Sequence, residues 1–110
     1  MPATLIDGKS LAAAVRASQK GAIESLAARG VRPGLAAVLV GNDPASRVYV
    51  RNKARACEET AVRSEIHEFP EQVSETALLE RVTQLNADPL VHGILVQLPL
   101  PRQFDSFRVL

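Results

Sequence analysis

The chain has 110 residues, 46% of them hydrophobic and 23% charged, which is an ordinary composition for a single globular domain. Thirteen basic and twelve acidic residues give a net charge of +1, which argues against nucleic acid or an anionic membrane as the main partner. The one cysteine, Cys57, cannot form an internal disulfide, and no apolar run approaches the ~20 residues that span a bilayer. We therefore expect a reduced, cytoplasmic protein that binds small molecules.

The N-terminal segment predicts one long helix. Asp7 is suited to cap it, and Gly30 is a natural residue to end it. Thr4-Leu5-Ile6, before the cap, indicates a short strand or an anchoring arm. The apolar positions of this helix repeat with a period of about 3.6 residues, and they are Leu11, Val15, Ala22, Ile23 and Leu26.

The next segment predicts a buried strand followed by a second helix. Residues 35–40 are all apolar, which is typical of a strand covered on both faces. Asp43 is then a suitable N-cap and Pro44 a suitable first helical residue, so we expect a helix over 44–61. Its core-facing stripe is expected to consist of Val50, Ala54, Cys57 and Ala61.

Tyr49 and Lys53 lie one turn apart on this second helix, about 90° around it from the core stripe. At the border between core and solvent, an aromatic ring and an amine can contact the same ligand. The alternative is structural: Lys53 as a solvated lysine and Tyr49 as a half-buried packing ring. Spacing alone does not decide between the two.

The opposite flank of the same helix carries a row of arginines at i, i+4 and i+8, namely Arg47, Arg51 and Arg55. Glu58 and Glu59 are within reach of Arg55. A solvated and partly salt-bridged face is the favoured interpretation, and a contact with an acidic ligand tail is the alternative.

The second half of the chain predicts a weaker strand over 64–69, better suited to a sheet edge, with His67 as a surface histidine in it. No cysteine, second histidine or carboxylate pair at metal-ligand spacing accompanies His67. Ser74 is a suitable cap for a third helix that ends at 86–89.

A last apolar strand is expected over 93–98, with one polar residue, Gln97, near its carboxyl end. A polar side chain there must find hydrogen-bond partners or face a ligand. Pro99 and Pro101 then end the ladder, and residues 104–110 can at most begin another helix.

These elements alternate in the order α-β-α-β-α-β, which predicts an α/β fold: a three-layer αβα domain with a small, mostly parallel sheet. Right-handed crossovers bring the carboxyl ends of parallel strands to one edge, where ligands bind in open α/β sheets. We therefore expect Tyr49, Lys53 and Gln97 to line one pocket at that edge.

Four segments, in order and over nearly the whole chain, resemble the bifunctional methylenetetrahydrofolate dehydrogenase/methenyltetrahydrofolate cyclohydrolase family. They are Ile6-Asp7-Gly8-Lys9, residues 33–46, residues 49–53 with 56–59, and residues 93–101. The resemblance implies that residues 1–110 form the tetrahydrofolate-binding catalytic domain of an enzyme of one-carbon metabolism and purine biosynthesis.

That enzyme would oxidise 5,10-methylenetetrahydrofolate to the methenyl compound with NADP and hydrolyse the product to 10-formyltetrahydrofolate. The resemblance further implies a cytoplasmic homodimer when full length, tetrahydrofolate derivatives as partners, and no metal, nucleic acid or membrane. By motif, Lys53 is implied as the catalytic lysine, Gln97 as the residue that orients it, and Tyr49 as the ring against the folate. The implied substrate-binding residues are Tyr49, Val50, Arg51, Asn52, Lys53, Val96, Gln97, Leu98 and Pro99.

The chain departs from the family pattern in two respects. It stops before the family's NADP-binding Rossmann domain and its Asp-Gly-Phe segment, and it contains no G-x-G-x-x-G, so no cofactor-binding residue is expected in it. His92 stands where the family usually has aspartate, at the amino end of the last strand, where we expect it to matter little.

Two other classes of protein remain open. One is a folate-binding or oligomerisation module without turnover. The other is a signalling domain with the same α/β order, which is disfavoured because Asp43 has no acidic neighbours at the strand ends.

Overall fold

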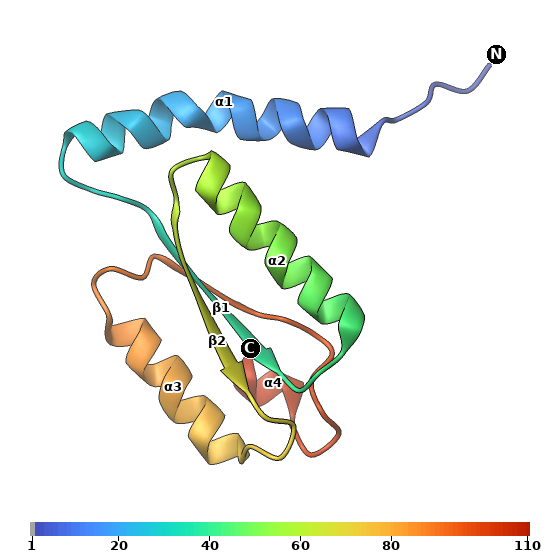
Figure 1. Cartoon of the computed structure of the whole chain (residues 1–110), viewed down its shortest axis with the longest axis vertical. Helices are drawn as coiled ribbons and strands as arrows, with labels where there is room; N and C mark the ends of the chain where they lie inside the picture. The colour runs from blue at the N-terminus through green and yellow to red at the C-terminus, as the bar shows by residue number, and fades with distance from the viewer. Residues whose placement is uncertain (1) are drawn as a thin grey trace.

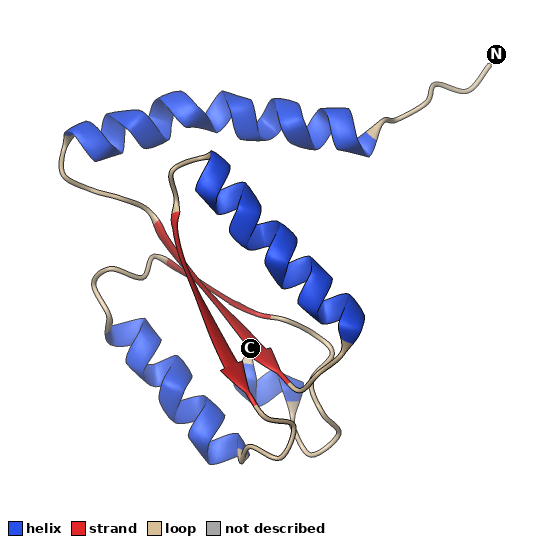
Figure 2. Ribbon diagram, in the orientation of Figure 1, coloured by secondary structure: helices blue, strands red, loops and turns tan. Residues whose placement is uncertain are grey.

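The computed structural model describes residues 2–110, which form one parallel sheet of three strands with helices on both faces (Figures 1 and 2). The strand order is β2-β1-β3. The elements are α1 (Gly8–Ala28), β1 (Gly34–Val40), α2 (Pro44–Glu59), β2 (Arg63–Phe69), α3 (Glu75–Ala87), β3 (Gly93–Val96) and α4 (Ser106–Val109). Because α2 covers one face of the sheet and α3 with α4 the other, the predicted three-layer fold is confirmed.

β1 is the central strand, and its alternating side chains supply both halves of the core. Ala37 and Leu39 pack with Val50 of α2 on one face. On the other face β1 packs in a larger cluster, whose members from the remaining elements include Leu78, Leu85, Val96, Phe104 and Val109. A strand buried on both faces was expected from its unbroken apolar run.

β2 is an edge strand, as predicted, and charged side chains protect it. Glu65 pairs with Arg63 and with His67, whose Nε2 lies 3.0 Å from a Glu65 oxygen. The other ring nitrogen of His67 lies 2.9 Å from Arg81 of α3. His67 is therefore a half-buried link between strand and helix, not the surface histidine that we expected.

The predicted helix starts are confirmed. Asp7, Asp43 and Ser74 each accept a hydrogen bond from the backbone N–H three residues on. At the first of these caps, two hydrogen bonds from Ser10 lower the pKa of Asp7. The bond from the Ser10 side chain has the larger effect, and the bond from its backbone N–H has the smaller one.

The predicted end of α2 is wrong by two residues. The helix ends at Glu59, and Ala61 is exposed with a φ of +61°, so it does not belong to the core stripe. Thr60 is buried instead. The N–H of Val62 donates to the carbonyl of Cys57 and that of Ala61 to Glu58, a closing pattern in which the left-handed position usually belongs to glycine.

α1 lies apart from the three layers (Figure 1). None of its residues is buried, and of the apolar positions predicted for it only Ile23 and Leu26 are partly covered. The radius of gyration, 16.5 Å, exceeds the roughly 13 Å of a compact domain of this size. Residues 4–6 before it form an exposed arm and no strand. Neither α1 nor any other helix in the described chain is long and apolar enough to cross a membrane.

β3 is shorter than predicted, since it ends at Val96 and leaves Gln97 and Leu98 outside the strand. The N–H of Gln97 still donates to Val38 at 2.9 Å. Pro99 has no N–H to continue the ladder, which accounts for the early end.

At the amino end of the sheet, His92 and Gly34 hold β1 and β3 together. The N–H of His92 donates to the Gly34 carbonyl at 2.8 Å, and the N–H of Gly34 donates to Nδ1 of His92 at 3.0 Å. His92 lies away from the carboxyl edge, as expected, but it satisfies a backbone donor and so has a structural role that we did not expect.

We predict that Gly34→Ala lowers the free energy of unfolding by about 1–3 kcal/mol, the usual effect of overpacking. A Cβ at this position would lie 2.1 Å from the backbone oxygen of Leu90, which cannot move aside as a side chain would. Gly93→Ala is the matched control, because its Cβ would meet Leu35 at an ordinary 3.5 Å. Urea unfolding of both variants measures the difference, and equal effects would contradict the prediction.

We also predict that Glu65→Gln makes the free energy of unfolding less dependent on pH in the acid range. The hydrogen bond from His67, with the charge of Arg63, holds the pKa of Glu65 below its usual value. A carboxyl whose pKa is lower in the folded than in the unfolded chain stabilises the fold at pH values above the unfolded-state pKa, which is near 4.3 for glutamate. This stabilisation is lost as the pH falls through the folded-state pKa. Unfolding free energies between about pH 6 and 3 should therefore fall less steeply in Glu65→Gln than in the wild type. The exposed Glu80→Gln should follow the wild-type curve.

Candidate functional site

The candidate site lies where α2 passes the carboxyl end of β3. α2 starts sharply because Gly41, with a φ of +86°, turns the chain after β1 and the Asp43 carboxylate accepts the Ser46 N–H at 2.9 Å. The helix then carries Tyr49 and Lys53 one turn apart on one flank.

Lys53 and Gln97 are in direct contact, although 44 positions separate them in the sequence. The Lys53 Nζ donates to Oε1 of Gln97 at 2.6 Å. The parallel pairing of β1 with β3 places Gln97 beside Val38, below this flank of α2. The predicted convergence of these two side chains is confirmed.

The carbonyl of Leu98 ties this pair to the start of α2. It accepts from Nε2 of Gln97 at 3.0 Å and from the Ser46 hydroxyl at 3.4 Å. With its other amide group engaged in this way, Gln97 presents its oxygen to Lys53. The amide orientation is therefore fixed from both ends.

Ser46 is the residue of this network that the sequence analysis did not single out. It is only 2% exposed. A signal was present, since Ser46 lies four residues before Val50 and thus on the core stripe, where a hydroxyl needs a partner.

The remaining residues implied for the substrate divide into two groups. Tyr49 is 54% exposed and Leu98 45% exposed, and both are open to a ligand. Val50 and Val96 are buried as whole residues and are not open to a ligand. The other three are exposed; they are Arg51, Asn52 and Pro99. Of these, Arg51 points about 160° around the axis of α2 from Lys53 and so away from the Lys53–Gln97 pair.

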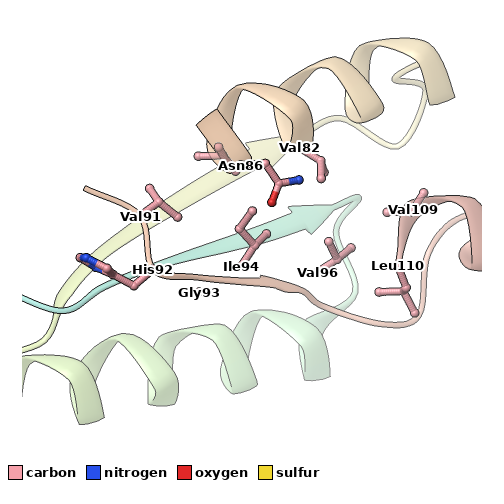
Figure 3. A pocket seen from close by; sticks show the side chains of 10 residues that line it. Val82, Asn86, Val91, His92, Gly93, Ile94, Val96, Val109 and Leu110 are labelled. Carbon is pink, nitrogen blue, oxygen red and sulfur yellow. The ribbon is translucent and has the colours of Figure 1, made fainter. Parts of the chain in front are cut away.

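The expected single pocket is not formed. One cavity at the carboxyl edge, of about 300 Å³, is lined by the β1–α2 turn, Glu71 and residues 99–101, and by none of Tyr49, Lys53 and Gln97. A second cavity of about 430 Å³ lies between α3, β3 and the C-terminal segment (Figure 3). Its lining residues are mostly apolar, with Asn86 and His92 as the polar side chains, while most of its exposed lining surface comes from polar atoms. The candidate site is therefore an open face.

Residues 2–110 hold no side-chain cluster that fits a metal ion, and the start of α2 does not fit a dinucleotide phosphate. No three His, Cys, Asp or Glu side chains among residues 2–110 are close enough to hold a metal ion. The start of α2 is a poor phosphate site because the Asp43 carboxylate already occupies it and Pro44 has no N–H. Cys57 is buried, and this burial raises the pKa of its thiol, which disfavours the reactive thiolate.

Comparison with known proteins places this geometry in context. The family model for the catalytic domain of tetrahydrofolate dehydrogenase/cyclohydrolase matches residues 6–110. Curated relatives include the bifunctional protein FolD of Nitrosospira multiformis, 57% identical over 109 residues, and that of Moorella thermoacetica, 56% identical over 110. These matches cover 99% and 100% of this chain, but 38% and 39% of the relatives, so the chain spans less than half of their length.

Solved structures with the same architecture include the bifunctional FolD enzyme of Campylobacter jejuni, with a TM-score of 0.93 and 42% identity over 96% of this chain and 38% of that one. The Trypanosoma brucei FolD, in complex with NADP and an inhibitor, has a TM-score of 0.92 and 36% identity over 99% of this chain and 38% of that one. The chain therefore belongs to the tetrahydrofolate dehydrogenase/cyclohydrolase family and matches its catalytic domain.

Proposed function

We propose that residues 1–110 form the tetrahydrofolate-binding catalytic domain of an enzyme that converts 5,10-methylenetetrahydrofolate to 10-formyltetrahydrofolate in two steps. An NADP-dependent oxidation would give the methenyl compound, and hydrolysis would follow. The observation that carries the proposal is the 2.6 Å contact between Lys53 and Gln97 on an open face at the carboxyl edge of the sheet.

Lys53 is proposed to move the protons of the hydrolysis. As water adds to the methenyl carbon, a C–O bond forms and the amine takes a proton from the water. The C–N bond to one folate nitrogen then breaks, the hydroxyl loses its proton to solvent as it becomes the formyl carbonyl, and the amine returns the first proton to that nitrogen. Overall, one proton is released to solvent. The same group can serve as base and acid because the two transfers follow one another.

Gln97 is proposed to fix the position of the amine. Its oxygen accepts the Lys53 hydrogen bond and, being neutral, does not lock the amine into an ion pair. None of the ion pairs formed within residues 2–110 involves Lys53. The remaining hydrogen-bonding capacity of the amine is thus free for water and substrate.

Tyr49 is proposed to pack against the flat pterin ring. Its position, one turn before Lys53, and its exposure leave the ring face free, and its hydroxyl can also hydrogen-bond. The exposed side chain of Leu98 adds apolar surface beside Gln97.

The hydride acceptor is proposed to bind outside these 110 residues. This chain has no glycine-rich phosphate loop, and the start of α2 does not fit a phosphate. NADP is our choice because the related Trypanosoma brucei structure contains it. By family membership we further propose a cytoplasmic enzyme of purine biosynthesis that is a homodimer when full length.

In the full-length enzyme, Lys53→Met should lower cyclohydrolase turnover by at least about 100-fold, the usual contribution of a positioned acid–base group. Methionine keeps much of the apolar stem, so the fold and the dehydrogenase step should suffer less. Spectrophotometric rates of both steps, with exposed Lys20→Met as the control, provide the measurement. Unchanged hydrolysis in Lys53→Met would assign the proton transfers to another residue.

The isolated 110-residue chain should reduce no NADP when given 5,10-methylenetetrahydrofolate, because it lacks a site that presents the nicotinamide. It should still bind a tetrahydrofolate analogue weakly through the Tyr49 face, since only one wall of the cleft is present. Absorbance of the reduced cofactor and calorimetric titration measure the two properties. NADP reduction by this chain would refute the proposed location of the cofactor site.

The same measurements on the isolated chain and on the full-length protein distinguish an enzyme from a folate-binding module without turnover. The Lys53–Gln97 pair is complete in this chain. Binding of the analogue without hydrolysis of the methenyl compound, by the full-length protein as well as by the chain, would favour a module without turnover.

A further inference from the structure

The flank of α2 opposite Lys53 borders a further hollow, of about 540 Å³, distinct from the two cavities described above. Arg51 and Arg55 of α2 line it together with Arg32, from the segment before β1. Ala54 and Val62 provide part of its apolar lining. Three guanidinium groups from two separate segments of the chain therefore meet around one concavity.

The carboxylate of Glu58 also lines the hollow, but it forms no ion pair with these three guanidinium groups. Within residues 2–110, no carboxylate forms an ion pair with Arg32, Arg51 or Arg55, and the one hydrogen bond among them joins Nε of Arg32 to the Ala61 carbonyl at 3.4 Å. The pairing expected between Arg55 and Glu58 or Glu59 is not formed. Arg51 and Arg55, four residues apart on one helix, repel each other.

Two neighbouring arginines, Arg47 and Arg63, do form ion pairs with carboxylates. Arg47, in the same row, donates to Asn42 at 2.6 Å and pairs with Glu68 at 3.1 Å. Arg63, at the rim of the hollow, is held by Glu65 and the Leu90 carbonyl. The fold thus provides carboxylate partners for these two arginines and leaves three others around the hollow without one.

The hollow is separate from the proposed folate face. Arg51 and Lys53 point about 160° apart around the helix axis. Arg32 and the first residues of β2 place the hollow towards the amino edge of the sheet, whereas Gln97 follows the carboxyl end of β3. This separation makes the acidic tail of a bound folate a poor occupant, and a nucleotide seated here would not reach Lys53.

We propose that this hollow, the Arg32/Arg51/Arg55 site, binds a small molecule carrying a phosphate or diphosphate group. Guanidinium forks match phosphate oxygens in pairs, and several forks can share the oxygens of one group. The volume is in the range of small-molecule sites. A net charge of +1 and a concave surface disfavour nucleic acid.

The test is a calorimetric or NMR titration of the 110-residue chain with inorganic pyrophosphate near 0.15 M salt. We expect saturable binding of one equivalent, weakened at least about 10-fold by the double variant Arg51→Gln/Arg55→Gln. Arg47→Gln/Arg16→Gln removes the same charge from outside the site and should change affinity by less than about 2-fold. Circular dichroism verifies that both double variants are folded.

Three outcomes would overturn the proposal: no binding of pyrophosphate, equal weakening by the two double variants, or citrate binding as tightly as pyrophosphate. The first two would show a solvated basic face, and the third a site for anions in general. Lys53→Met should leave pyrophosphate binding unchanged, so this result does not depend on the proposed folate function.

Discussion

The parallel pairing of β1 with β3 is the constraint on which both the core and the candidate site depend. β1 packs against α2 with Ala37 and Leu39 and against the larger cluster with alternate residues, so it fixes the two helical layers relative to each other. The same pairing sets Gln97 beside Val38. A slip of one residue would turn every β3 side chain to the opposite face. The Lys53–Gln97 contact would then be lost together with the burial of Val96.

The parts of the fold that could be predicted are those that local chemistry determines. An unbroken apolar run from 35 to 40 predicts a doubly covered strand, and the three helix caps are read from single polar residues. The end of α2 could not be predicted in this way, because an alanine at position 61 takes the conformation that glycine usually takes. The separation of α1 from the three layers could not be predicted either, because the apolar period of a helix does not specify which element packs against it.

The candidate site needed three kinds of information. Helical spacing places Tyr49 and Lys53 on one flank, and the strand topology predicts that Gln97 meets them. The chemical roles come from the family, since nothing in spacing distinguishes a catalytic lysine from a solvated one. Ser46 was missed because its partner, the Leu98 carbonyl, is a backbone atom 52 positions away that no side-chain pattern reveals.

α2 thus carries cations with different chemistry on its two flanks. Lys53 meets a neutral amide oxygen, and an amine can give up and regain a proton during a reaction. Arg51 and Arg55 present planar guanidinium groups, each with several N–H donors, on the other flank. Such groups suit the binding of anions and not proton transfer. The two flanks of α2 therefore differ in the chemistry that each could support: proton transfer beside Gln97 and anion binding beside Arg32.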